Sequence, residues 1–426
     1  MMNRFLTLTA ALSMFLAASA ASEKIILLNE GIWQADNGKI TYLEDDHIVS
    51  NQWFRDINKS KLGDTPNDII KVNENLIAIA VNWSNIVQFI YPDGRAVAAT
   101  EDIPNNRKLA TDGDNIYVSS YGHECGIDGR YEEFTKGFVA KIDASTFKVT
   151  DACEVGYEPE GIAYYDGYLF VANTGGYAFQ EDHEYETTIS VIDAERMAVI
   201  RTVDVKQINL YGKMSQSGQY LCINSPGDYY EVPAATIILD CEAVVNGQPD
   251  SHCFVSLPYA ATYNCVTRNG QFYAVGSRYS YITGEYAFNY ITIAPEEVMA
   301  SNGERGITEE FPGTLLEDMK NMSMPYGIYV NPYTGYIYAT DAASFAEGGI
   351  LYQWSPEGKL LGKYDTYINP SHFLALKPDN MATDIKYIPY IQPAHNTPVY
   401  DITGIPVTRL LPGNIYIQNG KKFIAK

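Results

Sequence analysis

Short apolar runs separated by polar turns dominate the chain, a pattern typical of β-strands rather than helices. The pattern is clearest in the middle, where Gly161–Tyr165 and Tyr168–Asn173 flank Asp166-Gly167. An Asp-Gly pair between apolar runs predicts a tight hairpin, because a type I′ turn needs positive φ at both central residues. After a long polar segment, Thr188–Asp193 and Ala198–Val205 predict a second hairpin. Four antiparallel strands of this length are typical of one blade of a β-propeller.

The first of these hairpins recurs along the chain, each time as a strand, a tight polar turn and a strand that ends in a small or polar residue. Six such hairpins begin near residues 67, 107, 160, 210, 262 and 326, at intervals typical of a propeller repeat. Besides the central pair, the expected strand pairs are Asp68–Val72 with Leu76–Asn82, Lys108–Thr111 with Asn115–Ser119, Leu210–Met214 with Gln219–Asn224, Tyr263–Thr267 with Gln271–Gly276, and Tyr326–Val330 with Gly335–Asp341.

The two ends of the repeat region supply a seventh blade. Lys24–Asn29 has the character of a second strand with no first strand before it, and Lys39–Leu43 and His47–Phe54 follow it. The missing inner strand is available in His372–Leu376. A ring closed by strands from both ends leaves no open edge. The sequence therefore predicts an all-β fold, a seven-bladed β-propeller over residues 21–377, in preference to a β-sandwich.

Both termini differ from the repeat. Residues 1–20 have the features of a secretory signal peptide, with Arg4, the apolar run Phe5–Ala17 and an A-x-A cleavage site at Ala18-Ser19-Ala20. They predict an exported protein, at the cell surface or outside the cell, with the periplasm as transit or alternative. No Cys lies near the cleavage site, so lipoprotein processing is not expected. Residues 378–397 are expected to be a linker, and residues 398–426 a small C-terminal β appendage.

The net charge and the cysteines bear on possible partners, disulfides and cofactors. A net charge of −22 repels nucleic acid phosphates, so no nucleic acid partner is expected. In an exported chain the six cysteines are candidates for pairing. Cys241 and Cys253 lie symmetrically about Asn246-Gly247, the expected tip of a hairpin, and predict a disulfide; Cys125 and Cys153 are a second candidate pair. The chain shows no Cys/His spacing typical of zinc sites, and no cofactor is expected.

The loops between the second and third strands are expected to emerge on one face of the ring, beside the central channel. Four of the second strands end in Asn and one in Asp, which predicts either capping of strand ends or a ring of ligand contacts. The same loops concentrate aromatic residues, and long loops on a rigid scaffold commonly carry function. The candidate ligand-binding residues are Asn29, Trp33, Asn82, Trp83, Tyr121, Asn173, Tyr177, Tyr185, Asn224, Tyr230, Tyr279, Tyr281 and Asp341.

Charged residues near this face suggest further chemistry. The candidates to bind acidic groups of a ligand are Arg107, Lys108, Arg130, Lys213 and Arg278. The acidic run 181–186 is either a cation site or a solvated loop. Motifs of serine hydrolases, zinc proteases, P-loop proteins and dinucleotide enzymes are missing, so no enzyme is predicted. A metal-dependent lactonase or lyase remains an alternative, with carboxylates from Glu30, Asp68, Glu160 and Asp341.

Several stretches carry a family resemblance. Leu28–Trp33, Leu62-Gly63-Asp64 and Gly156–Ile162, with Val171-Ala172-Asn173 and Val191-Ile192-Asp193, resemble the YncE-like surface β-propellers of Bacteroidetes. The resemblance implies a cell-surface protein that captures a corrinoid such as cobalamin for a TonB-dependent outer-membrane transporter. A corrinoid is a broad ring with amide edges, which suits an aromatic and Asn-rich face.

The C-terminal appendage carries a resemblance of its own. Val399-Tyr400-Asp401, Pro412–Ile417 and Asn419–Lys422 resemble a C-terminal sorting domain of the type IX secretion system. The alternative for the appendage is a plain β stalk. The alternative for the whole protein is a surface module that binds protein or glycan.

Overall fold

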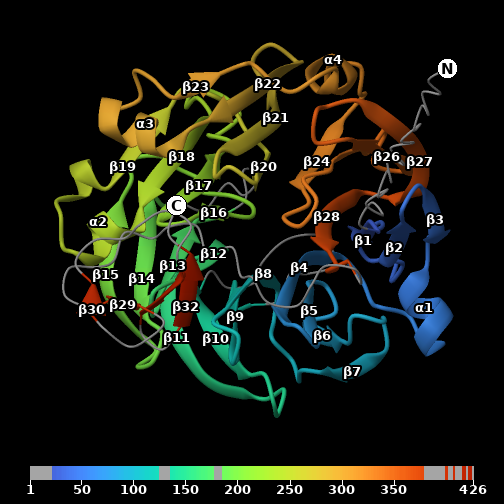
Figure 1. The fold of residues 1–426 in the computed structure, drawn as a ribbon, viewed down its shortest axis with the longest axis horizontal. Helices are drawn as coiled ribbons and strands as arrows, with labels where there is room; N and C mark the ends of the chain where they lie inside the picture. The colour runs from blue at the N-terminus through green and yellow to red at the C-terminus, as the bar shows by residue number, and fades with distance from the viewer. Residues whose placement is uncertain are drawn as a thin grey trace, which may run out of the picture.

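Seven four-stranded antiparallel sheets form a ring around a central axis (Figure 1). The computed structural model describes residues 22–123, 135–176 and 185–378 together with the short tail strands 399–401, 406–407, 415–418 and 421–424. In each sheet the strands follow one another in chain order from the axis outward, except where the ring closes. The predicted seven-bladed β-propeller is therefore confirmed.

The ring closes by joining the two ends of the repeat region within one blade. Strand β28 (Pro370–Ala375) pairs with β1 (Lys24–Asn29), and the register sets Ile26 opposite Leu374 and Leu27 opposite Phe373. Figure 1 shows β28 beside the N-terminal strands of the ring. This closure confirms the expected use of residues 372–376, and it pairs the inner edge of β1, which would otherwise be open.

The first four blades are formed by strands β1 to β15 together with β28. Blade 1 consists of β28, β1, β2 (Lys39–Glu44) and β3 (His47–Ser50). Blade 2 consists of β4 (Pro66–Asn73), β5 (Leu76–Val81), β6 (Ile86–Ile90) and β7 (Ala96–Ala99). Blade 3 consists of β8 (Asn106–Thr111), β9 (Asn115–Ser120), β10 (Lys136–Asp143) and β11 (Val149–Tyr157). Blade 4 consists of β12 (Pro159–Tyr165), β13 (Tyr168–Asn173), β14 (Thr188–Asp193) and β15 (Ala198–Asp204).

Three further blades complete the ring. Blade 5 consists of β16 (Ser215–Ser217), β17 (Tyr220–Ser225), β18 (Ala235–Asp240) and β19 (Phe254–Leu257). Blade 6 consists of β20 (Tyr263–Val266), β21 (Phe272–Ser280), β22 (Glu285–Ile293) and β23 (Ile307–Thr308). Blade 7 consists of β24 (Pro325–Val330), β25 (Ile337–Asp341), β26 (Gly348–Trp354) and β27 (Leu360–Ile368).

The helices are short and lie in the connections. They are α1 (Trp53–Asn58), α2 (Cys241–Val245), the 3₁₀-helix η1 (Asp250–His252), α3 (Pro295–Ser301) and α4 (Leu315–Lys320). Among the described residues, none of these helices has the length and apolar character needed to cross a bilayer.

The tail strands pair with one another in a sheet of their own, in the order β30 (Pro406–Val407), β29 (Val399–Asp401), β31 (Ile415–Gln418) and β32 (Lys421–Ile424). The division of the chain into propeller, linker and sorting tail stays a prediction. The predicted signal peptide and residues 379–398 lie outside the described residues.

Turn chemistry and packing explain why the sequence forms these blades. Asp166 and Gly167 have φ values of +45° and +90°, as the expected type I′ turn requires. Alternate strand residues point toward the neighbouring blade, so each apolar core lies between two blades. Phe170 of blade 4 and Leu221 and Ile237 of blade 5 share one such core and are fully buried.

Three segments differ from the predicted strands. Blade 1 ends its outer strand at Ser50, because Trp53 turns inward on helix α1 and stacks on Tyr42 at 4.7 Å between ring centroids. The inner strand of blade 5 is Ser215–Ser217 rather than Leu210–Met214, because Gly212 adopts a φ of +87° that interrupts the extended backbone. The connection between the second and third strands of blade 6, expected to be a loop, is instead a ribbon that continues β21 and β22 to a tight turn at 281–284.

The predicted disulfide between Cys241 and Cys253 is wrong, since both residues are buried free thiols. The expected hairpin between them is replaced by α2 and η1, with Asp240 capping α2 through the backbone N–H of Ala243. The Cys253 thiol donates to the carbonyls of Gln248 and Pro249 instead. Cys153 of the second candidate pair is also a free thiol, and Cys125 lies outside the described residues.

These thiols are expected to resist alkylation in the folded protein. Burial raises the pKa of the Cys265 thiol to about 12, and it also raises the pKa values of Cys222 and Cys241, so little thiolate is present at pH 8. We expect iodoacetamide to label these three residues only after urea is added, as measured by mass spectrometry of peptides without reductant. A Cys241–Cys253 disulfide would instead leave both peptides unlabelled and joined in urea.

Candidate functional site

A pocket of about 790 Å³ lies in the central channel, and we call it the channel pocket. Its wall is formed by inner-strand residues of six of the seven blades and by the ends of the second strands of blades 1 and 2. This volume lies within the range of roughly 300–1,000 Å³ that is usual for sites that bind drug-sized molecules. The residues that matter below are Glu30, Trp33, Asn67, Asn82, Trp83, Arg107, Lys108, Tyr211, Lys213, Asn264, Tyr326 and His372.

Two tryptophans form the aromatic part of the channel pocket. Trp33 follows β1 and Trp83 follows β5, so neighbouring blades bring them together with ring centroids 5.0 Å apart in an edge-to-face arrangement. Trp33 is 43% exposed, although Trp53 and Trp354 are buried. Beside them, the Asn82 amide donates to Asn105 Oδ1 and to the Asn106 carbonyl, both at 2.7 Å. The sequence predicted all three of these pocket residues.

Two consecutive residues of β8 bring positive charge into the wall of the channel. Their side chains point in opposite directions, as strand geometry requires. Arg107 reaches blade 4, where its Nε donates to Glu160 Oε1 at 2.7 Å and Nη2 forms an ion pair with the same carboxylate. Lys108 reaches blade 2, where its Nζ donates to the Asn67 carbonyl at 2.6 Å. Burial lowers the pKa of the Lys108 ammonium. The negative charges of Glu160 and Asp68 raise that pKa, but the effect of burial is larger.

A second ion pair crosses the ring from blade 2 to blade 5. Lys213 Nζ donates to Asp68 Oδ1 at 2.6 Å. The other Asp68 oxygen accepts from the backbone N–H of Leu109 at 2.9 Å. Although burial raises the pKa of the Asp68 carboxyl, the charges of Lys213 and Lys108 outweigh it, and the net shift is downward. Asp68 is therefore held ionised at neutral pH by groups of the wall itself.

Glu30 and His372 form a third polar contact, between the two chain ends that close blade 1. Glu30 Oε1 lies 3.3 Å from His372 Nε2, and Oε2 accepts from the Tyr326 hydroxyl at 3.0 Å. Burial and the charge of Lys108 lower the pKa of His372, so its imidazole is neutral at pH 7. The pKa of Glu30 is lowered despite burial, chiefly through His372. Burial together with the charge of Glu30 raises the pKa of Tyr326, which therefore remains protonated.

Four of the five Asn and Asp residues at strand ends serve the backbone rather than the channel pocket. Asn29, Asn173 and Asn224 are at most 2% exposed, and Asp341 is 5% exposed. The Asn173 amide donates to Thr188 Oγ1 and Ser190 Oγ, and its oxygen accepts from the Gly156 N–H. Asp341 accepts from the N–H groups of Ser323, Met324 and Ala343. Of the five residues, only Asn82 lines the channel pocket, and the other four bond to backbone and side-chain groups of the blades.

Tyr121 is also unavailable to a ligand, because it is fully buried and its hydroxyl donates to Glu160 Oε1 at 2.6 Å. Tyr185 is half-buried, and burial together with the charge of Asp228 raises its pKa to about 12. Tyr177, Arg130 and most of the acidic run 181–186 lie outside the described residues. In the ranges that the structure describes, no group of three or more His, Cys, Asp and Glu side chains is arranged to hold a metal ion.

The remaining predicted residues, Tyr230, Tyr279 and Tyr281, form a cluster with Tyr286 that we call the tyrosine patch. Tyr230 stacks on Tyr281 at 5.0 Å, and Tyr279 packs edge-on against Tyr281 at the same distance. Tyr230, Tyr281 and Tyr286 are 41–50% exposed. The patch lies on the β21–β22 ribbon and the loop after β17, and none of its residues lines the channel pocket. The tyrosines and the two tryptophans all lie in or next to connections between second and third strands, but only the tryptophans line the channel pocket.

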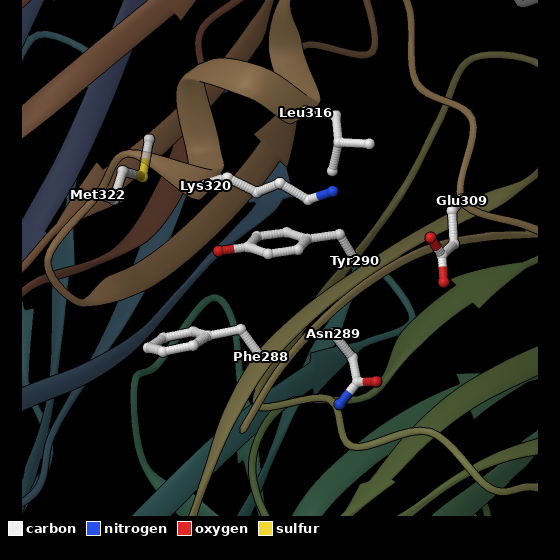
Figure 2. Close-up of a pocket in the computed structure, with 7 residues that line it drawn as sticks. All are labelled: Phe288, Asn289, Tyr290, Glu309, Leu316, Lys320 and Met322. Atoms are coloured by element: carbon white, nitrogen blue, oxygen red, sulfur yellow. The ribbon is translucent and has the colours of Figure 1, made fainter. Parts of the chain in front are cut away.

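A smaller hollow of about 250 Å³ lies between blades 6 and 7 (Figure 2). In Figure 2, Phe288 and Tyr290 of β22 face Leu316 and Lys320 of α4. Tyr290 is buried, and its hydroxyl donates to the Met319 carbonyl at 3.3 Å, so this contact ties α4 to blade 6. The hollow is below the usual size of a ligand site. The channel pocket is therefore the better candidate.

Sequence reasoning missed part of the channel pocket. His372, Tyr326, Tyr211 and Asn264 line it, yet none was singled out as a ligand contact. His372 is the third residue of its inner strand, as Asp68 and Lys108 are of theirs. Tyr326 and Asn264 are the second residues of β24 and β20, and Tyr211 precedes β16. An alignment of the inner strands of the predicted blades, in addition to the loops, could have identified these four residues from the sequence.

Comparisons with known proteins leave the family open. No family model matches the chain, and no curated protein matches it in sequence. Hydrazine synthase from Kuenenia stuttgartiensis matches in structure with 14% identity over 72% of this chain and 88% of that chain, at a TM-score of 0.49. A quinonprotein alcohol dehydrogenase-like protein from Bacteroides thetaiotaomicron matches with 11% identity over 82% and 77%, at 0.49. Apo AztD from Citrobacter koseri matches with 10% identity over 84% and 99%, at 0.46. At TM-scores below 0.5, these similarities carry no argument about ligand or activity.

Proposed function

We propose that this protein is an exported, non-enzymatic β-propeller that captures a small ligand in the channel pocket. The observation that carries the proposal is the channel pocket itself, a space of about 790 Å³ with exposed Trp33 and half-buried Trp83 on one side and a few charged groups in its wall. Aromatic side chains with a small number of placed polar groups are typical of small-molecule sites.

Binding rather than catalysis is favoured by the way the carboxylates of the wall are used. Asp68 accepts from Lys213 and from backbone N–H groups, and Glu30 accepts from Tyr326 and contacts His372. Glu160 is fully buried against Arg107 and Tyr121. Of the four carboxylates considered for a lactonase or lyase, Asp341 caps backbone N–H groups instead. These roles hold the blades together and leave the tryptophan side of the pocket for a ligand.

A corrinoid is the specific ligand that the family resemblance suggests, for delivery to a TonB-dependent transporter. Trp33 and Trp83 offer aromatic surface to a broad ring, and the Asn82 side chain lies beside them. Titration with cyanocobalamin, followed by heat release and by tryptophan fluorescence, tests this form of the proposal. The absence of binding at micromolar ligand would remove the corrinoid and leave other small ligands to be screened in the same assay.

Replacing Trp33 by Ala is expected to weaken capture by about 2 kcal/mol, roughly 30-fold in Kd, because aromatic anchors dominate the affinity of such sites. Trp83→Ala should have a similar effect, since the two rings support each other. Calorimetry measures the change without relying on the fluorescence of the residue removed. Tyr230→Ala is the matched control, because Tyr230 is an exposed aromatic residue outside the channel pocket.

The tyrosine patch favours a second candidate function, a surface module that binds protein or glycan. Exposed, mutually packed tyrosines give a large rigid contact area at low entropic cost. Binding to cell-envelope fractions that is lost in Tyr230→Ala and retained in Trp33→Ala would support this function over small-ligand capture. The reverse result would support capture.

A further inference from the structure

Lys108 differs from the other cations of the channel pocket in what neutralises it. Arg107 is paired with Glu160, and Lys213 is paired with Asp68. Among the described residues, Lys108 Nζ has no carboxylate within 4.0 Å, and the one hydrogen bond of its side chain goes to the carbonyl of Asn67. Its side chain is nonetheless almost fully buried, with 6% exposed, and it lines the pocket.

This arrangement leaves an incompletely satisfied positive charge at the pocket wall. An ammonium group has three N–H donors, and the described residues accept from one of those of Lys108. A buried charge with few partners is costly, and an acceptor that arrives with a negative charge offsets that cost. The downward pKa shift of Lys108, caused first by burial, has the same origin.

The carboxylates near Lys108 act on it through their charges, but each of them already has another partner in the protein. Glu160 is fully buried behind Arg107, and Asp68 is fully buried and bonded to Lys213 and to backbone donors. Glu30 is engaged by Tyr326 and His372, and the imidazole of His372 is neutral at pH 7. Lys108 is thus a cation of the pocket without a carboxylate partner, and two of its three N–H donors have no acceptor among the described residues.

We propose that the channel pocket selects ligands that carry an anionic group, a carboxylate, phosphate or sulfonate, and that Lys108 binds this group while Trp33 and Trp83 contact the apolar part. This inference rests on the proposed capture function and specifies its ligand class. A ligand of this kind spans the pocket from the tryptophans to the inner strand of blade 3.

The test uses two fluorescent probes that share one ring system and differ in charge: 1-anilinonaphthalene-8-sulfonate, an anion, and N-phenyl-1-naphthylamine, which is neutral. In Lys108→Gln we expect the affinity for the sulfonate to fall by about tenfold or more, as loss of a charged hydrogen bond predicts, while the neutral probe is unchanged. Lys108→Arg should retain much of the affinity. Lys61→Gln is the control, because Lys61 is an exposed lysine paired with Asp36.

The outcomes separate this inference from the capture function. If Trp33→Ala weakens both probes and Lys108→Gln affects both equally, the pocket binds ligands and the anion preference is overturned. If Trp33→Ala affects neither probe, the capture site itself is wrong. If Lys108→Gln does not fold, the wild-type protein can be tested with two competitors that differ in charge. We expect 1-naphthalenesulfonate to displace the anionic probe at a lower concentration than the neutral 1-naphthalenesulfonamide. Equal displacement by the two compounds would overturn the inference.

Discussion

Glu160→Gln is expected to lower the free energy of unfolding by about 3–5 kcal/mol, because it removes the charge that neutralises a buried guanidinium. Glu160 is fully buried. Its Oε1 accepts from Arg107 Nε at 2.7 Å and from the Tyr121 hydroxyl at 2.6 Å. The substitution keeps the shape of the side chain, so the loss reports charge and hydrogen bonding rather than a cavity. Urea unfolding followed by tryptophan fluorescence measures it as a lower midpoint at unchanged slope.

Glu154→Gln is the matched control for this prediction. Glu154 forms an ion pair with Lys136 at 3.5 Å, but the two side chains are 71% and 50% exposed. Exposed pairs of this kind contribute about 0–1 kcal/mol, so the midpoint should hardly move. Equal shifts in the two variants would mean that the Arg107–Glu160 contact does not join blades 3 and 4 in the way its geometry indicates.

Removing strand β28 is expected to abolish folding, whereas removing only the residues after it is not. A chain that ends at Asn369 lacks the inner strand of blade 1, and with it Phe373, which is buried and stacks on Tyr329 at 5.6 Å. Loss of one buried aromatic side chain costs about 3–5 kcal/mol, and the whole stability of a domain is about 5–15 kcal/mol. The lost strand also takes its backbone ladder with β1, so the ring is left open at an apolar edge.

A chain that ends at Pro378 retains β28 and is the comparison for this experiment. We expect it to keep the far-ultraviolet circular dichroism of the full protein and a similar urea midpoint. A folded chain ending at Asn369 would contradict closure by β28. An unfolded chain ending at Pro378 would instead contradict the predicted separation of the C-terminal appendage from the propeller.

The blades could be predicted because their signals are local. A turn such as Asp166-Gly167 depends on two residues, and an apolar run such as Tyr168–Asn173 depends on six, so neither requires knowledge of the distant chain. The errors arose where tertiary packing overrides local preference. Trp53 leaves the outer strand of blade 1 to stack on Tyr42, and Cys241 begins a helix instead of a hairpin arm.

The candidate site was predicted only in part, for the same reason. The aromatic loop residues were visible in the sequence, but their grouping was not, so Trp33 and Trp83 line the channel pocket while Tyr230 and Tyr281 lie elsewhere. The Asn residues at strand ends were predicted to be either ligand contacts or caps, and Asn29, Asn173 and Asn224 are buried in the structure and do not line the channel pocket.

The sequence alone determined the blade count, the closure by residues 372–376 and the identity of most charged groups near the channel, because these follow from short-range periodicity and turn residues. Only the tertiary structure decided which charges meet. Lys213 and Asp68 are 145 positions apart and form an ion pair because the ring brings blade 5 across from blade 2. The same geometry leaves Lys108 beside a carbonyl rather than a carboxylate. Distances across a closed ring depend on the packing of all seven blades, and no local pattern contains that information.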